Sequence, residues 1–372
     1  MHFKIDNLKI GGFSANIAKP GETVNVICRA SLTSDDPLFF TYIDGLSNLI
    51  FQSQHISIGS VYEFLLLAHD DSTADVYVND FPCCLRIRTK CNISAGAPVF
   101  NSQIADIVGI SFPDITIKDD DKIAFCFKVD WKFGLFFDFT GDPSFSVEQN
   151  QIAIAAIYRH LAFQHVYESI RSLPLYDKIR NDGWFPFIEI ASKEYKTLVK
   201  AYEGKADIES ILLTLGSSFD KTRLDAISSK WWSNKIFNDK KPILSAGVNA
   251  YLQSTNDGYI TCIKTLISEI EGILRIQYFS ESGKGNHVKL TKLLEYLTSK
   301  ASLNSISSHS LLLPTHFLKY LTDVVFRDFD LEAGSLNLSR HSSCHGVAGP
   351  TEYTQCRALQ LILVLDQLFY YV

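Results

Sequence analysis

The spacing of apolar residues divides the chain into two parts of different character. Up to about residue 145, short runs of β-branched and aromatic residues are separated by turn-forming residues, which is typical of strands. From about residue 148, apolar positions recur every three or four residues, as on one face of a helix. The pattern predicts an α+β fold, with a β-rich domain at residues 1–147 and a helical domain at residues 148–372.

Individual elements follow from the same patterns. Strands are predicted within residues 23–32, 74–80, 84–90, 114–131 and 134–142. An acidic cluster at residues 119–121 lies between two alternating runs, which predicts a β-hairpin there. Helices are predicted within residues 146–173, 192–204, 207–219, 243–254, 257–279, 287–300, 314–329 and 351–372. Polar stretches at residues 280–287 and 299–310 are predicted to be loops.

Size and composition agree with two folded domains. The chain has 372 residues, which exceeds the roughly 250 to 300 residues at which one hydrophobic core usually stops growing. Its 46% hydrophobic content is sufficient for substantial cores. The N-terminal segment lacks the pattern of a secretory signal, and no run of 18 uncharged apolar residues occurs. We therefore expect a cytoplasmic protein without a membrane partner.

Charge and cysteine content narrow the chemistry. A formal net charge of -6 is not that of a protein that binds duplex DNA through a broad basic surface, so any nucleic-acid contact must be local. The eight cysteines show no CxxC pair and no zinc-finger spacing. We expect most of them to be reduced and buried, and we expect no metal site and no cofactor.

The most informative stretch is residues 336–350, LNLSRHSSCHGVAGP, directly before the last apolar helix. Arg340 is permanently cationic, and His345 can exchange a proton near neutral pH. RNA carries its own nucleophile, the 2′-hydroxyl group. An endoribonuclease therefore needs an acid or base near the reacting oxygens and a cation at the phosphate. This pair could supply both without a metal.

The spacing of the pair is awkward for one regular helix. Five positions advance about 500°, which leaves Arg340 and His345 roughly 140° apart around the axis. Gly346 suggests that the helix ends at His345. The pair could therefore straddle a helix end, or a second subunit could complete the site.

The hexapeptide RHSSCH at residues 340–345 resembles the signature of the HEPN superfamily, an arginine followed after four to six residues by a histidine. His341 fills the polar position that follows the arginine in that signature. Its Arg-His opening is also similar to the motif of HEPN nucleases that process pre-rRNA. GWFPFIEI (183–190) and SEIEGILR (268–275) resemble segments of bacterial HEPN-bearing proteins. The resemblance covers about the last 110 to 220 residues.

The resemblance implies an all-α HEPN-like bundle with its nuclease core at about residues 255–372. It implies a homodimer with a metal-independent ribonuclease site between subunits. Arg340 and His345 carry over as catalytic residues, and His341 as a supporting one. Because many relatives are toxins or antiviral-defence effectors, RNA is the expected substrate and an antitoxin or inhibitory partner is implied.

Each of these residues also has a structural interpretation. Arg340 could bridge Asp328, Asp330 or Glu332 while His345 merely ends its helix. Alternatively, His341 and His345, one turn apart, could bind a metal together with Cys344, although Ser342 stands where zinc proteases carry glutamate. On these interpretations the domain would be a non-catalytic helical module that binds RNA or protein.

Further residues carry similar alternatives. Glu271 and Arg275, one turn apart, predict a helix salt bridge, and one of them could instead orient Arg340 from a neighbouring helix. Glu269 has the same ambiguity. Lysines near the predicted loop at residues 280–287 could contact RNA phosphates or simply face solvent: Lys284, Lys289 and Lys292.

A second group combines tryptophans with lysines. Lys230, Trp231 and Trp232, with Lys235, Lys240 and Lys241 close by, could hold single-stranded RNA, or the tryptophans could belong to the core.

Overall fold

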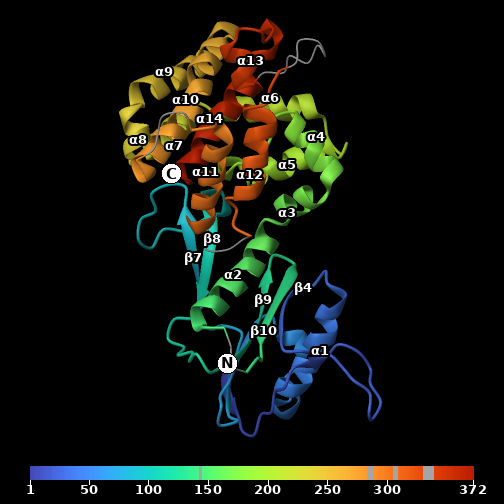
Figure 1. The fold of residues 1–372 in the computed structure, drawn as a ribbon. Helices are drawn as coiled ribbons and strands as arrows, with labels where there is room; N and C mark the ends of the chain where they lie inside the picture. The colour runs from blue at the N-terminus through green and yellow to red at the C-terminus, as the bar shows by residue number, and fades with distance from the viewer. Residues whose placement is uncertain (142–144, 284–287, 305–308, 330–338) are drawn as a thin grey trace. The chain divides into compact units, whose positions relative to one another are not determined.

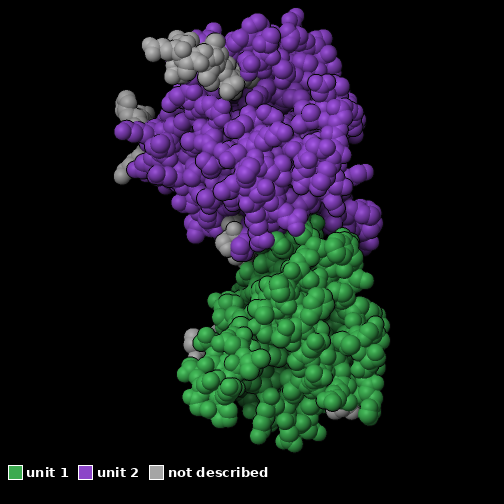
Figure 2. All heavy atoms as spheres, turned by 90° about the vertical axis from the view of Figure 1, so that its right-hand side faces the viewer, with its two compact units in different colours: residues 1–88, 107–164 green, residues 89–106, 165–372 purple. Residues whose placement is uncertain are grey.

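The computed structural model describes residues 1–141, 145–283, 288–304, 309–329 and 339–372 (Figure 1). It confirms the predicted α+β class, with an antiparallel sheet followed by a helical region. The chain forms two compact units (Figure 2). Unit 1 comprises residues 1–88 and 107–164, and unit 2 comprises residues 89–106 and 165–372.

Unit 1 is built on a six-stranded antiparallel sheet. Its strands lie in the order β1 (His2–Ile5), β6 (Ala74–Val78), β5 (Phe64–Ala68), β9 (Lys122–Val129), β10 (Lys132–Asp138) and β4 (Arg29–Thr33). Central strand β5 is buried along its whole length, which explains why it is apolar at every position instead of alternating. Two short antiparallel pairs complete the strands: β2 (Phe13–Ser14) with β3 (Val26–Ile27), and β7 (Cys84–Thr89) with β8 (Ile104–Ser111).

Helices cover both faces of this sheet (Figure 1). On one face, α1 (Pro37–Phe51) packs Tyr42, Leu46 and Ile50 against Leu66 and other inward residues of the strands. On the other face, α2 (Val147–Ala162) stacks Tyr158 on Phe127, with ring centroids 5.8 Å apart. Because α2 buries its apolar face on the sheet, unit 1 extends to residue 164 instead of ending at residue 147.

Three details of the N-terminal region differ from the sequence patterns. Helix α1 was not predicted, although Asp36 caps its start and Pro37 occupies its first turn. The hairpin at residues 119–121 is absent from the described structure, because β9 pairs with β5 and β10 instead. Asp121 binds the His69 imidazole at 2.6 Å. The cysteines form no disulfide, but Cys83, Cys84, Cys91 and Cys344 are exposed, so the expectation of mostly buried thiols was wrong.

Unit 2 is helical apart from the segment at residues 89–106. Its N-terminal helices are α3 (Gln164–Arg171), α4 (Leu173–Asn181), α5 (Lys193–Tyr202), α6 (Ile208–Ser218), α7 (Lys221–Trp231), α8 (Lys235–Asp239) and α9 (Lys241–Tyr251). The remaining helices are α10 (Asn256–Ser282), α11 (Leu290–Asn304), α12 (Pro314–Tyr320), α13 (Arg340–Cys344) and α14 (Gln355–Phe369). A π-helical turn, Leu321–Val325, continues α12.

Helix α10 organises the C-terminal part of unit 2. Thr255 caps its start by accepting a hydrogen bond from the Gly258 amide, and Gly283 ends it in the left-handed conformation with φ 65°. It packs against α9, α11, α13 and α14. Helix α11 continues through Asn304, so the loop predicted from residue 299 begins later, because buried Ala301 holds this turn against the core.

The last helix, α14, is a core helix. Its residues from Ala358 to Leu368 are buried throughout. In the described part of the chain, no helix is both long and apolar enough to span a membrane.

Candidate functional site

The candidate motif forms the short helix α13 and its end. Ser339 caps the start of the helix, and its hydroxyl group accepts a hydrogen bond from the Ser342 amide. His345 is the C-terminal cap residue, and Gly346 follows with φ 73°. A positive φ is what glycine supplies after a helix. The predicted helix end at His345 is confirmed.

Helix α10 fixes α13 at both ends. Near the C-terminal end of α13, the Lys264 ammonium group donates to the Ser343 carbonyl oxygen at 2.5 Å. At its first residue, Arg340 Nη2 lies 2.9 Å from Glu271 Oε2. Lys264, Glu271 and Arg275 fall within an arc of about 40° on α10, because spacings of 7 and 11 residues bring side chains back to one face. One face of α10 therefore carries the contacts with α13.

The Glu271 carboxylate is shared by two guanidinium groups. Its Oε1 atom lies 2.8 Å from Arg275 Nε and 2.6 Å from Arg275 Nη2, and its Oε2 atom binds Arg340. The Glu271 side chain is 12% exposed, whereas Arg340 and Arg275 are 30% and 39% exposed. Two cations share one carboxylate, so the trio keeps one net positive charge at a partly exposed position.

The salt bridge predicted between Glu271 and Arg275 is therefore present. Glu271 also contacts Arg340 from the neighbouring helix, which was the alternative interpretation of this residue. The predicted partner Asp328 does not take Arg340. The other two, Asp330 and Glu332, lie outside the described residues.

The two histidines lie away from this trio. His341 Nε2 is 3.7 Å from Asp328 Oδ1, and Asp328 is nearly fully exposed. His345 is exposed, with its ring centroid 5.7 Å from that of Phe329. Within the described chain, no hydrogen bond or ion pair joins Arg340 to His345. One chain places the two groups at opposite ends of α13 without bringing them into contact.

The lysines proposed for RNA binding have different outcomes. Lys284 lies outside the described residues. Lys289 is exposed and directly follows Val288, whose carbonyl oxygen accepts a hydrogen bond from Arg275 Nη1 at 3.0 Å. This bond keeps Lys289 near the Glu271 trio. Lys292 is also exposed.

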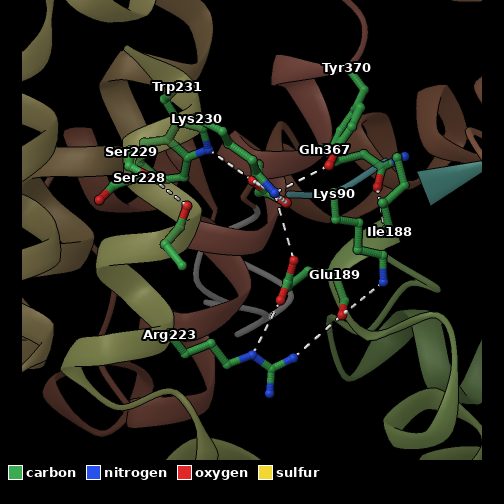
Figure 3. A network of polar contacts seen from close by, with 12 residues as sticks. Lys90, Ile188, Glu189, Arg223, Ser228, Ser229, Lys230, Trp231, Gln367 and Tyr370 are labelled. Carbon is green, nitrogen blue, oxygen red and sulfur yellow. Dashed lines mark hydrogen bonds and ion pairs between the residues drawn. The ribbon is translucent and has the colours of Figure 1, made fainter. Parts of the chain in front are cut away.

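The Lys230 and Trp231 pair belongs to the core (Figure 3). Trp231 is fully buried, and its indole Nε1 donates to Asp366 Oδ1 at 2.9 Å. Lys230 Nζ lies 2.8 Å from the same carboxylate, on the fully buried face of α14. Burial alone would lower the pKa of Lys230, but the neighbouring Asp366 outweighs burial and raises it. Trp232 is half-buried under Lys241, whose ammonium nitrogen lies 5.3 Å from the ring centroid.

The buried ion pair extends into a larger network that the sequence did not indicate (Figure 3). Glu189 lies 3.7 Å from Lys230 and 3.3 Å from Arg223 Nε. Lys90, which is almost entirely buried, donates to the Glu189 carbonyl oxygen at 3.4 Å, and burial lowers its pKa. Its members come from distant parts of the chain, so local periodicity contains no signal for it.

The segment GWFPFIEI, which resembles part of bacterial HEPN-bearing proteins, packs in the same core. Phe185 and Phe187 are fully buried against Tyr320, with centroid distances of 5.4 Å each. The Ile188 amide donates to Gln367 Oε1 on α14 at 2.9 Å. In this structure the segment has a packing role.

No protein-family model, curated protein or solved structure matches this chain. Among the described residues, no cluster of three or more histidine, cysteine, aspartate or glutamate side chains could hold a metal ion. The functional argument therefore rests on the α10 and α13 geometry and on the sequence motif.

Proposed function

We propose that unit 2 is a metal-independent endoribonuclease, in which Arg340 stabilises the phosphate charge and His345 transfers a proton. The observation that carries this proposal is the Glu271 carboxylate, which orients the Arg340 guanidinium group from a neighbouring helix at 2.9 Å. A catalytic cation must be held in place before substrate arrives, and a partly buried carboxylate provides that orientation. His345, at the other end of α13, is exposed and accessible to RNA.

The reaction needs only the groups of RNA and these side chains. The 2′-oxygen loses its proton and bonds to phosphorus, while the bond from phosphorus to the 5′-oxygen breaks. The products are a 2′,3′-cyclic phosphate and a 5′-hydroxyl group. His345 would exchange one of the two protons involved, and Arg340 would offset the negative charge on the phosphorane.

A homodimer would solve the geometric difficulty. Arg340 and His345 of one chain share no contact in the described structure, and a second copy could bring a histidine to the first copy's arginine. Light scattering should then report about twice the mass of one chain. A monomer that still cuts RNA would exclude the composite site.

Activity is tested by incubating the purified protein with RNA in EDTA and analysing the product ends. Arg340→Ala and His345→Asn should each reduce cleavage by about 10² to 10⁴-fold, and His341→Ala should have a smaller effect. Matched controls are Arg171→Ala and His55→Asn, which change exposed residues far from α13 in sequence. Products ending in 3′-hydroxyl groups with strict Mg²⁺ dependence would contradict the mechanism.

We further propose that such an activity would act in a toxin or antiviral-defence setting, restrained by an antitoxin or another inhibitory partner. Expression of the natural chain should then slow the growth of its host, and His345→Asn should relieve the effect. Equal toxicity of the two chains would contradict this setting.

A second candidate is a non-catalytic module that binds RNA through the same cations. The observation that favours it is that Arg340 already has a carboxylate partner and does not contact His345. Binding without cleavage by the wild-type protein, with affinity lost in Arg340→Ala, would select this function.

A further inference from the structure

An exposed aromatic side chain lies next to the cationic part of the candidate site. Phe279 on α10 is 57% exposed, and Ile276 beside it is 43% exposed. Phe279 comes one turn after Arg275 and about 40° from it around the helix axis, so the two side chains are neighbours on one surface. Large apolar side chains at such exposed positions carry no packing role within the described chain.

The charges around Phe279 are mainly positive. Arg275 and Arg340 share the Glu271 carboxylate and leave one positive charge, and Lys289 adds a second. The next carboxylate on α10, Glu281, points about 120° away from this side and is occupied by Lys300 and Tyr296. The surface around Phe279 is therefore complementary to a polyanion.

We infer that this surface, formed by Arg275, Phe279 and Lys289, binds single-stranded RNA, with a base stacked on Phe279 and phosphates at the two cations. Aromatic rings interleaved with cations are how proteins hold single strands with little sequence preference, because every base has a flat face. A duplex keeps its bases stacked internally, so it cannot use the ring in this way. A second copy related by symmetry would place like charges against each other, which disfavours self-association here.

This inference rests on the proposed function only in its choice of RNA. Binding at Phe279 does not require cleavage, and cleavage at Arg340 does not require stacking. The two proposals can therefore fail separately.

The experiment measures fluorescence anisotropy of a labelled 2′-O-methyl oligouridylate of about twenty nucleotides. This probe cannot be cut by the proposed reaction, because its 2′-oxygen is blocked. Phe279→Ala should weaken binding by about 5 to 150-fold, since stacking on one aromatic ring contributes ~1 to 3 kcal/mol. Phe279→Trp should preserve binding, whereas Phe279→Leu should weaken it although the residue stays apolar.

The matched control is Phe100→Ala, which removes another exposed phenylalanine, 62% exposed and distant in sequence. Its affinity for the probe should equal that of the wild type. Lys289→Gln should reduce the slope of log affinity against log salt by about one, as expected for one lost phosphate contact.

Several results would overturn the inference. One is an unchanged affinity in Phe279→Ala, and another is equally tight binding of a duplex of the same length. Dissociation of a dimer by Phe279→Ala, with the monomer binding the probe as before, would assign the surface to a second copy instead. Unchanged probe binding together with intact RNA cleavage removes only this inference, whereas Phe279-dependent binding without any cleavage removes only the nuclease proposal.

Discussion

The contact between Glu271 and Arg340 can be tested without knowing the function. Glu271→Gln keeps the shape of the side chain and removes its charge, so two guanidinium groups lose their counterion. Charge-assisted hydrogen bonds contribute ~1.5 to 3 kcal/mol when buried. Arg340 and Arg275 are each about a third exposed, and solvent screening reduces that value. We expect unit 2 to lose about 2 kcal/mol of unfolding free energy in total.

A double-mutant cycle isolates the pair. The four proteins are wild type, Glu271→Gln, Arg340→Met and the double variant, unfolded in urea. Tryptophan fluorescence follows unit 2, because Trp184 and Trp231 are buried there. The coupling energy between Glu271 and Arg340 should be about 1 kcal/mol.

The same cycle with Arg275→Met provides an internal reference, because Arg275 binds the other oxygen of the same carboxylate. A Glu271 to Arg340 coupling below about 0.5 kcal/mol, within the range of independent sites, would refute the orientation of Arg340 by Glu271. The proposed positioning of the catalytic arginine would then lose its support.

Two further predictions concern the cores of the units. Asp366→Ala should destabilise unit 2 by about 3 to 5 kcal/mol in urea unfolding, because it leaves the Lys230 ammonium group buried without its counterion, whereas Asp366→Leu combined with Lys230→Met should cost much less; equal losses would contradict this account. In unit 1, burial by itself lowers the pKa of His69, but hydrogen bonds to Asp121 and Asp75 outweigh burial and raise it. The stability from His69 should therefore be complete below about pH 6.5 and be lost as pH rises through the raised pKa. His69→Gln should flatten that decline in urea unfolding measured between about pH 5 and 8, and an unchanged profile would exclude the imidazole as its source.

Much of the fold could be predicted because it depends on local chemistry. The alternation in β6 and β9 and the three-to-four spacing in α10 reflect which side of each element meets the core. The end of α13 was visible because Gly346 readily adopts a positive φ. Helix α1 was missed because its aromatic residues are common in strands, although Asp36 and Pro37 mark a helix start.

Pairings between distant segments were harder to predict. The acidic run at residues 119–121 was expected in a hairpin, but β9 found its partners in β5 and β10, and periodicity does not choose among strands of similar pattern. Trp231 and Lys230 were equally consistent with an exposed RNA-binding surface. Only the position of Asp366 on α14 decided that both lie in the core.

The candidate site shows the same division. The sequence by itself determined the residue types of the motif, the helix that carries Arg340, and the end of that helix at His345, because these follow from neighbouring residues. Only the tertiary structure decided that Glu271 holds Arg340, that His345 stays apart from it, and that Phe279 is exposed beside the cations. The physical reason is that burial and ion pairing depend on which helix faces which, and that choice is made by packing across the whole unit.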